Sequence, residues 1–145
     1  MSSVISPPGD ASIPSSAVSD HAVSVTLPGE RYIGVARLVT AGVAARFDLP
    51  FEVVDDLQLA VELVLAGAFT RTDDVTVGFD SDERVLSIAI SPVQASALAE
   101  TRAGYEGEAR IALQTLLERL VDSVVTEPGP VPTVVLRKAL EASLR

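Results

Sequence analysis

Apolar and polar residues alternate at several places along the chain with a period of two, the pattern of a half-buried β-strand. The clearest case is Ala22–Leu27, where Val23, Val25 and Leu27 alternate with small or hydroxyl-bearing residues. Asp73–Phe79 and Arg84–Ser91 are rich in Val, Ile and Thr, which predicts an antiparallel hairpin. Two closing strands are expected at Ser123–Glu127 and Thr133–Arg137, separated by the turn Pro128-Gly129-Pro130.

Three other segments repeat apolar residues at intervals of three and four, the period of an amphipathic helix. These segments are 31–47, 51–69 and 108–121, whereas Pro92–Gly107 is expected to be a loop or a short helix. The first stripe, expected to face the core, is Tyr32, Ala36, Val39, Val43 and Phe47. The second is Val53, Leu57, Ala60, Val61, Val64 and Ala68, and the third is Ala109, Leu113, Leu116, Leu117 and Leu120.

The order of these elements predicts the fold class. Each helix has one apolar stripe to bury, so three helices should cover one face of a mixed, mostly antiparallel sheet in a two-layer α+β sandwich. Residues 1–20 have a Ser/Pro/Gly bias, and we interpret them as a flexible N-terminal tail. One domain is expected over 21–140, followed by a short C-terminal tail at 141–145.

Composition narrows the classes of function. The net charge of −9 and the pI of about 4.4 disfavour binding to a nucleic-acid backbone, which needs clustered Lys and Arg. The chain has no cysteine and one histidine, His21, so no metal site is expected. The sequence shows neither a signal peptide nor an apolar run long enough to cross a bilayer, so we expect a cytoplasmic protein without a membrane partner.

Two stretches of the sequence resemble a known protein family. Leu27–Arg37 and Asp55–Val61, with the order and spacing of the elements, resemble the anti-sigma-factor serine kinases of the RsbW type, in the GHKL (histidine-kinase-like) ATPase superfamily. The similarity covers about Val23 to Leu140, and Thr133–Arg137 looks like the last strand of that family. It implies a histidine-kinase-like ATPase fold, a sigma factor and an anti-anti-sigma (STAS-type) protein as partners, and Mg-ATP as cofactor of a serine/threonine kinase.

The residues that the resemblance assigns to nucleotide chemistry are missing. In the family, a Glu and an Asn four residues later on the second helix activate water and hold Mg²⁺, and these places fall on Leu63 and Gly67. Glu62 is the remaining catalytic candidate, although neighbouring helical residues point about 100° apart. The Asp and glycines that read adenine are absent from Ile88–Ala95, and only Gly104 and Gly107 remain near the phosphate loop.

We therefore expect a degenerate member of the family, a pseudoenzyme without a cofactor that regulates transcription by protein binding. Two alternatives stay open: an active kinase that uses Mg-ATP, and a small-molecule sensor that uses the vacated pocket. Leu59 and Leu63 form a second apolar strip beside Gly67, which either fills the former nucleotide cavity or contacts a partner or ligand.

The outer side of the first helix is the candidate partner surface. It carries Arg31, Arg37 and Leu38 among the small residues Gly34, Ala41 and Ala45. Small residues let another backbone approach closely, and Arg binds carboxylates in a bidentate way. The alternative is an ordinary solvated face. A homodimer is a further option.

Overall fold

The computed structural model describes residues 21–102 and 111–140. The two expected tails lie outside the described residues, as do Gly104, Gly107 and Ala109. Among the described residues, the chain forms three α-helices and a five-stranded sheet, which confirms the α+β class.

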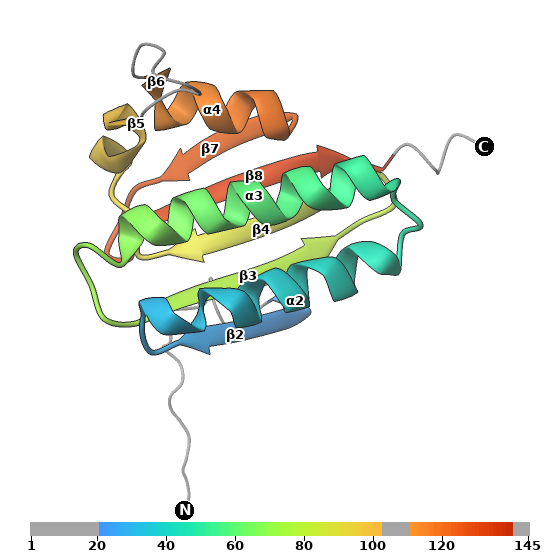
Figure 1. The fold of residues 1–145 in the computed structure, drawn as a ribbon, viewed down its shortest axis with the longest axis horizontal. Helices are drawn as coiled ribbons and strands as arrows, with labels where there is room; N and C mark the ends of the chain where they lie inside the picture. Colours follow the sequence, from blue (N-terminus) through green and yellow to red (C-terminus); the bar gives the residue numbers. More distant parts are fainter. Residues whose placement is uncertain (1–20, 103–110, 141–145) are drawn as a thin grey trace, which may run out of the picture.

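The sheet has the strand order β2-β3-β4-β8-β7, and all four neighbouring pairs are antiparallel (Figure 1). We expected a mixed, mostly antiparallel sheet. The strands are β2 (Val23–Leu27), β3 (Val75–Ser81), β4 (Val85–Ser91), β7 (Ser123–Glu127) and β8 (Thr133–Ala139). Val25, Val77, Ile90 and Val134 align in one row across four strands, and the last three of these are buried. This row belongs to the sheet face that packs in the core.

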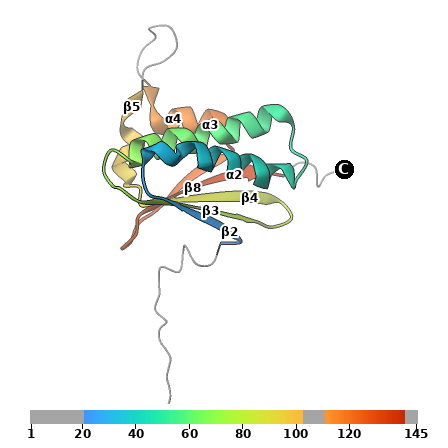
Figure 2. The same cartoon turned by 60° about the horizontal axis from the view of Figure 1, so that its bottom comes forward.

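The helices α2 (Ile33–Ala45), α3 (Phe51–Ala68) and α4 (Leu113–Leu120) lie on one face of the sheet. Figure 2 shows them as a layer over the strands, with α2 above β2. Two positions define the sharp break between α2 and α3. Asp48 adopts a left-handed conformation with φ of 55°, which an aspartate tolerates, and Pro50 immediately precedes α3.

Four short elements complete the described chain: two 3₁₀ helices, η2 (Glu30–Tyr32) and η3 (Ala95–Ala99), and a small ladder of β5 (Thr101–Arg102) and β6 (Ile111–Ala112). We expected a loop or a short helix over Pro92–Gly107, and η3 is the short helix in the part of that range that the structure describes. The predicted helix start near Glu108 is wrong where it can be compared, because residues 111–112 form a strand and α4 begins at Leu113.

Helix α2 faces the core with smaller side chains than we predicted. Its buried residues are Ala36, Thr40 and Ala44, spaced four apart on one face. Thr40 was not expected in the core, but it is 1% exposed and its hydroxyl donates to the Ala36 carbonyl at 2.7 Å, so its polar atom is satisfied. Tyr32 was wrongly placed in the stripe, because it precedes α2 and is 38% exposed.

Helix α3 buries the stripe that its sequence predicts, with two additions. Leu57, Ala60, Val61, Val64 and Ala68 are buried as expected, and Leu65 and Gly67 are buried as well. Val53 packs against the same core but is only partly buried, because it lies in the first turn of the helix. The wide apolar face lets α3 contact both the sheet and its neighbouring helices.

Candidate functional site

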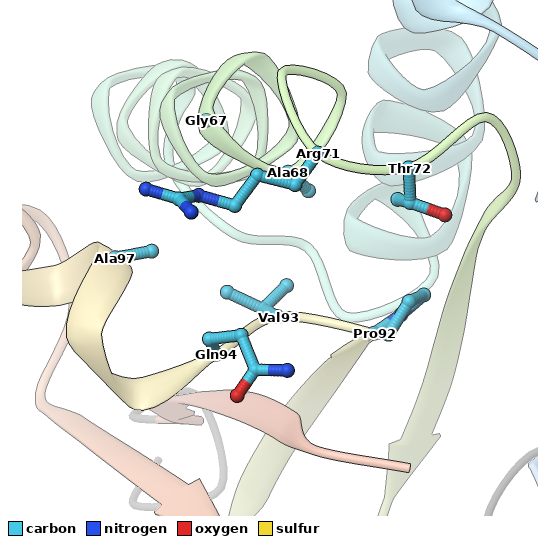
Figure 3. Close-up of a pocket in the computed structure, with 8 residues that line it drawn as sticks. All are labelled: Gly67, Ala68, Arg71, Thr72, Pro92, Val93, Gln94 and Ala97. Atoms are coloured by element: carbon cyan, nitrogen blue, oxygen red, sulfur yellow. The ribbon is translucent and has the colours of Figure 1, made fainter.

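A small pocket lies between the C-terminal end of α3 and the segment after β4. It has a volume of about 90 Å³, and its walls are formed by Gly67, Ala68, Arg71, Thr72, Pro92, Val93, Gln94 and Ala97 (Figure 3). This is the region where the resemblance to the GHKL family places a nucleotide. The pocket is well below the roughly 300 Å³ of the smallest typical ligand sites.

The walls of the pocket are mainly apolar. Arg71 carries the charge in the lining, and its Nη2 donates to Glu100 Oε2 at 2.6 Å, so the guanidinium reaches across the opening towards Ala97 (Figure 3). The Gly67 carbonyl accepts the Thr70 hydroxyl at 2.7 Å. None of the lining residues carries a carboxylate, the ligand that Mg²⁺ prefers among protein side chains.

Leu63 and Gly67, which the resemblance aligned with the family's Glu and Asn, have separate environments. Gly67 is buried and lines the pocket. Leu63 is partly buried and packs against the hydrophobic core. Leu59, the other residue of the second apolar strip, is exposed. The structure therefore brings Gly67 to the pocket and Leu63 into the core packing.

Glu62 and Arg37 form a pair between α3 and α2. Arg37 Nη1 donates to Glu62 Oε1 at 2.6 Å, and both side chains are about two-fifths exposed (42% and 41%). Gln58 Nε2 also donates to the Arg37 carbonyl at 2.9 Å. The catalytic candidate and one partner-binding candidate thus bind each other on the surface between two helices.

Of the other partner-binding candidates, Leu38 lies on the outer side of α2, whereas Arg31, expected on the same helix, lies in η2 just before it. Leu38 is 73% exposed, and Val35 beside it is also exposed. A Cβ added at Gly34 or Gly42 would meet no atom within 4 Å, so the backbone is open to a close approach there. The guanidinium of Arg31 lies 5.6 Å from the centre of the Tyr32 ring, a cation–π contact.

Sequence reasoning did not identify Arg71, Val93 or Ala97 as pocket residues. No motif marks them, because the segment after α3 and the segment after β4 come together only in the folded chain. The boundary at Ser91-Pro92, where β4 ends, was the available signal, since loops that follow strands often carry binding residues.

We also looked for metal sites, for membrane-spanning helices and for similar known proteins. In the ranges 21–102 and 111–140, no three His, Cys, Asp or Glu side chains come together as metal ligands would. No helix of the same ranges has the length and apolar character needed to cross a membrane. Protein-family models and characterised proteins give no match to the sequence.

Proposed function

We propose that this chain is a degenerate, cytoplasmic anti-sigma-like domain of the GHKL (histidine-kinase-like) type. It acts by binding a sigma factor or an anti-anti-sigma protein, and it does not use ATP. The two-layer α+β architecture is compatible with that superfamily. The resemblance of Leu27–Arg37 and Asp55–Val61 suggests the family. Leu63 and Gly67 stand where that family has the Glu and the Asn of its ATP site.

One observation carries the proposal: the pocket beside Gly67 is small and mainly apolar. At about 90 Å³ the pocket is by itself too small for a nucleotide, and the hollow of about 560 Å³ that shares Val93 and Gln94 with it is lined by no residue of α3. A triphosphate also needs hydrogen-bond donors and a metal ligand, and the guanidinium of Arg71 is already bound to Glu100. Protein binding is the family function that needs none of these groups.

Direct measurement of nucleotide binding tests the loss of ATP chemistry. We expect a fluorescent ATP analogue with Mg²⁺ to show no saturable binding at micromolar protein. We also expect no transfer of labelled phosphate to the serine of an anti-anti-sigma protein. Either signal, if abolished by excess unlabelled ATP, would establish the alternative of an active kinase.

The outer side of α2 is the surface that we assign to the partner. Leu38 supplies the exposed apolar contact, and Gly34 and Gly42 permit close approach. Arg31 of η2, just before the helix, is exposed and can meet a carboxylate. Arg37 contributes less, because Glu62 already binds its guanidinium.

Co-expression with each sigma factor and each anti-anti-sigma protein of the native cell tests this assignment. We expect Leu38→Glu to weaken the recovered complex by about tenfold or more, because it buries a charge at the contact. Val131→Glu, at another exposed apolar position in the turn between β7 and β8, is the matched control. Equal effects of the two variants would contradict the assignment.

The apolar pocket favours a second candidate function, a sensor of a small molecule. A cavity of about 90 Å³ with apolar walls can hold a ligand of a few heavy atoms. Thermal stabilisation by a small apolar probe such as benzene, abolished by Ala97→Leu, would support the sensor. No stabilisation up to the solubility limit of the probe would count against it.

A further inference from the structure

Strand β2 is an edge of the sheet, and among the described residues it pairs only with β3 (Figure 1). Its sequence, Val-Ser-Val-Thr-Leu, contains no proline and no charged side chain. Natural edge strands usually carry Lys, Pro or a bulge, because their free N–H and C=O groups otherwise accept another strand. Pro28 comes only after the last residue of β2. In the ranges 21–102 and 111–140, nothing therefore blocks strand addition at this edge.

A hollow of about 470 Å³ lies beside this edge, between β2, the β3–β4 hairpin and the C-terminal end of α2. We call it the edge groove. Its apolar walls are Val23 of β2, Val43 of α2, Phe47 just after α2, and Phe79 and Leu86 of the hairpin. Val23 is exposed, whereas Leu27, which points to the same side of β2, is buried. The groove is thus an apolar site that the described residues leave unfilled.

Of the two charged residues that line the edge groove, Asp80 has hydrogen-bond partners and Arg46 has none among the described residues. Arg46 lies in its lining and is exposed, and its guanidinium has no ion pair or hydrogen bond among the described residues. The acidic residue of the lining, Asp80, is already engaged. Its Oδ2 contacts Nδ1 of His21, and its Oδ1 accepts the Ala22 N–H at 2.9 Å. Of the described residues that line the groove, Arg46 therefore offers a cation without a described partner, in a chain whose net charge is −9.

We propose that β2 and the edge groove bind an extended, acidic segment of a partner protein by strand addition. Backbone groups of the segment pair with the free edge of β2, as in other cases of β-augmentation. One apolar side chain of the segment enters the groove between Val23 and Phe47. A neighbouring carboxylate binds the guanidinium of Arg46.

The dimensions and the charge favour a peptide segment over a second copy of this chain. Five residues of β2 present about 17 Å of edge, the length of a short peptide strand. If two copies paired through β2, the strand opposite would be Val-Ser-Val-Thr-Leu, which brings no carboxylate to Arg46. This site lies apart from the pocket beside Gly67, and the proposal does not depend on the loss of ATP binding.

Binding of two matched heptapeptides to the full chain tests the proposal. The acidic probe is Asp-Val-Thr-Val-Thr-Val-Asp and the basic probe is Lys-Val-Thr-Val-Thr-Val-Lys, with charges at both ends because the strand direction is open. Fluorescence anisotropy of the labelled probes measures affinity. Amide hydrogen exchange by NMR locates the site, since an added strand protects the free N–H groups of β2.

We expect the acidic probe to bind more tightly than the basic probe and to slow exchange in β2. Arg46→Glu should weaken the acidic probe by about tenfold and strengthen the basic probe, because it reverses the charge in the groove. Arg119→Glu on α4 makes the same change on another exposed surface and is the control. It should leave the preference for the acidic probe intact.

Three results would overturn the proposal. The first is no protection of β2 amides at about 1 mM acidic probe, which corresponds to less than about 4 kcal/mol of binding. The second is an equal effect of Arg46→Glu and Arg119→Glu, which would reduce the binding to overall charge. The third is slow amide exchange in β2 of the free protein. A dimer in sedimentation would assign this protection to a second copy, and its loss on deletion of residues 1–20 would assign it to that segment.

Discussion

At the scale of single residues, Asp82 is the described carboxyl group whose pKa clearly shifts. Its Oδ1 accepts the backbone N–H groups of Arg84 at 2.7 Å and Val85 at 2.8 Å in the turn between β3 and β4. These two bonds favour the charged form and hold the pKa of Asp82 below its ordinary value of 3.8. The carboxylate thus fastens the turn of the hairpin.

This arrangement predicts a pH-dependent effect of Asp82→Ala. The folded pKa is lowered, so the stabilisation is fully present above pH 3.8 and is lost as the pH falls through the folded pKa. We expect the variant to melt at a lower temperature than the native chain at pH 7. The difference should shrink as the pH falls below 3.8 and through the lowered folded pKa. A constant difference over the whole pH range would show that the carboxylate charge is not responsible.

The pair of Arg37 and Glu62 predicts a small, salt-dependent stabilisation. Both side chains are about two-fifths exposed, so water screens their attraction. A double-mutant cycle with Arg37→Ala and Glu62→Ala should give a coupling free energy of about 0.5 kcal/mol, falling further in 1 M salt. Urea unfolding of the four proteins measures it. A coupling above about 2 kcal/mol would contradict the view of a screened surface pair.

At the scale of elements, the packing of α2 predicts which of its positions tolerate a large side chain. Ala44 is fully buried at the contact of α2 with the core, so Ala44→Leu must displace neighbours and should cost about 1–3 kcal/mol. Leu38→Ala, on the outer side of the same helix, should change stability by less than about 0.5 kcal/mol. Chemical unfolding of both variants compares the two sides. The reverse order would place the core face of α2 elsewhere.

The strands show how much of the fold the sequence predicts. Ser123–Glu127 matches β7 residue for residue, and the turn Pro128-Gly129-Pro130 marks its C-terminal end. The prediction of the buried face of α2 was less accurate, because Thr40 is polar and gives no apolar signal. Its hydroxyl is nevertheless hydrogen-bonded within the helix, which allows its burial. The ladder of β5 and β6 was missed, because two-residue strands have no period to detect.

The candidate site was predictable only in part for a related reason. Sequence spacing identifies residues one helical turn apart, such as Leu63 and Gly67, and places them on one side of α3. It does not show that Gly67 reaches the pocket while Leu63 packs in the core. The pocket, which brings Gly67 and Ala97 together, and the pair of Arg37 with Glu62 join residues that are distant in the chain. Such contacts follow from the tertiary fold.

At the scale of the whole molecule, one hydrophobic core connects all the main elements. It includes buried residues from β2, α2, α3, both strands of the hairpin, η3, α4 and β8. No element among them has a separate core of its own in the described chain. A single-core domain below about 150 residues usually unfolds without a populated intermediate.

This continuity predicts one cooperative unfolding transition. Leu57 of α3 and Leu117 of α4 are both buried, so Leu57→Ala and Leu117→Ala should each cost about 2–5 kcal/mol. Because both leucines belong to the same core, each variant should shift the whole transition to lower temperature without splitting it. Calorimetry, with circular dichroism of the helices as a second probe, tests this expectation. If Leu117→Ala produced a separate early transition, α4 and its ladder would be an independent folding unit, and the pocket beside Gly67 could open without global unfolding.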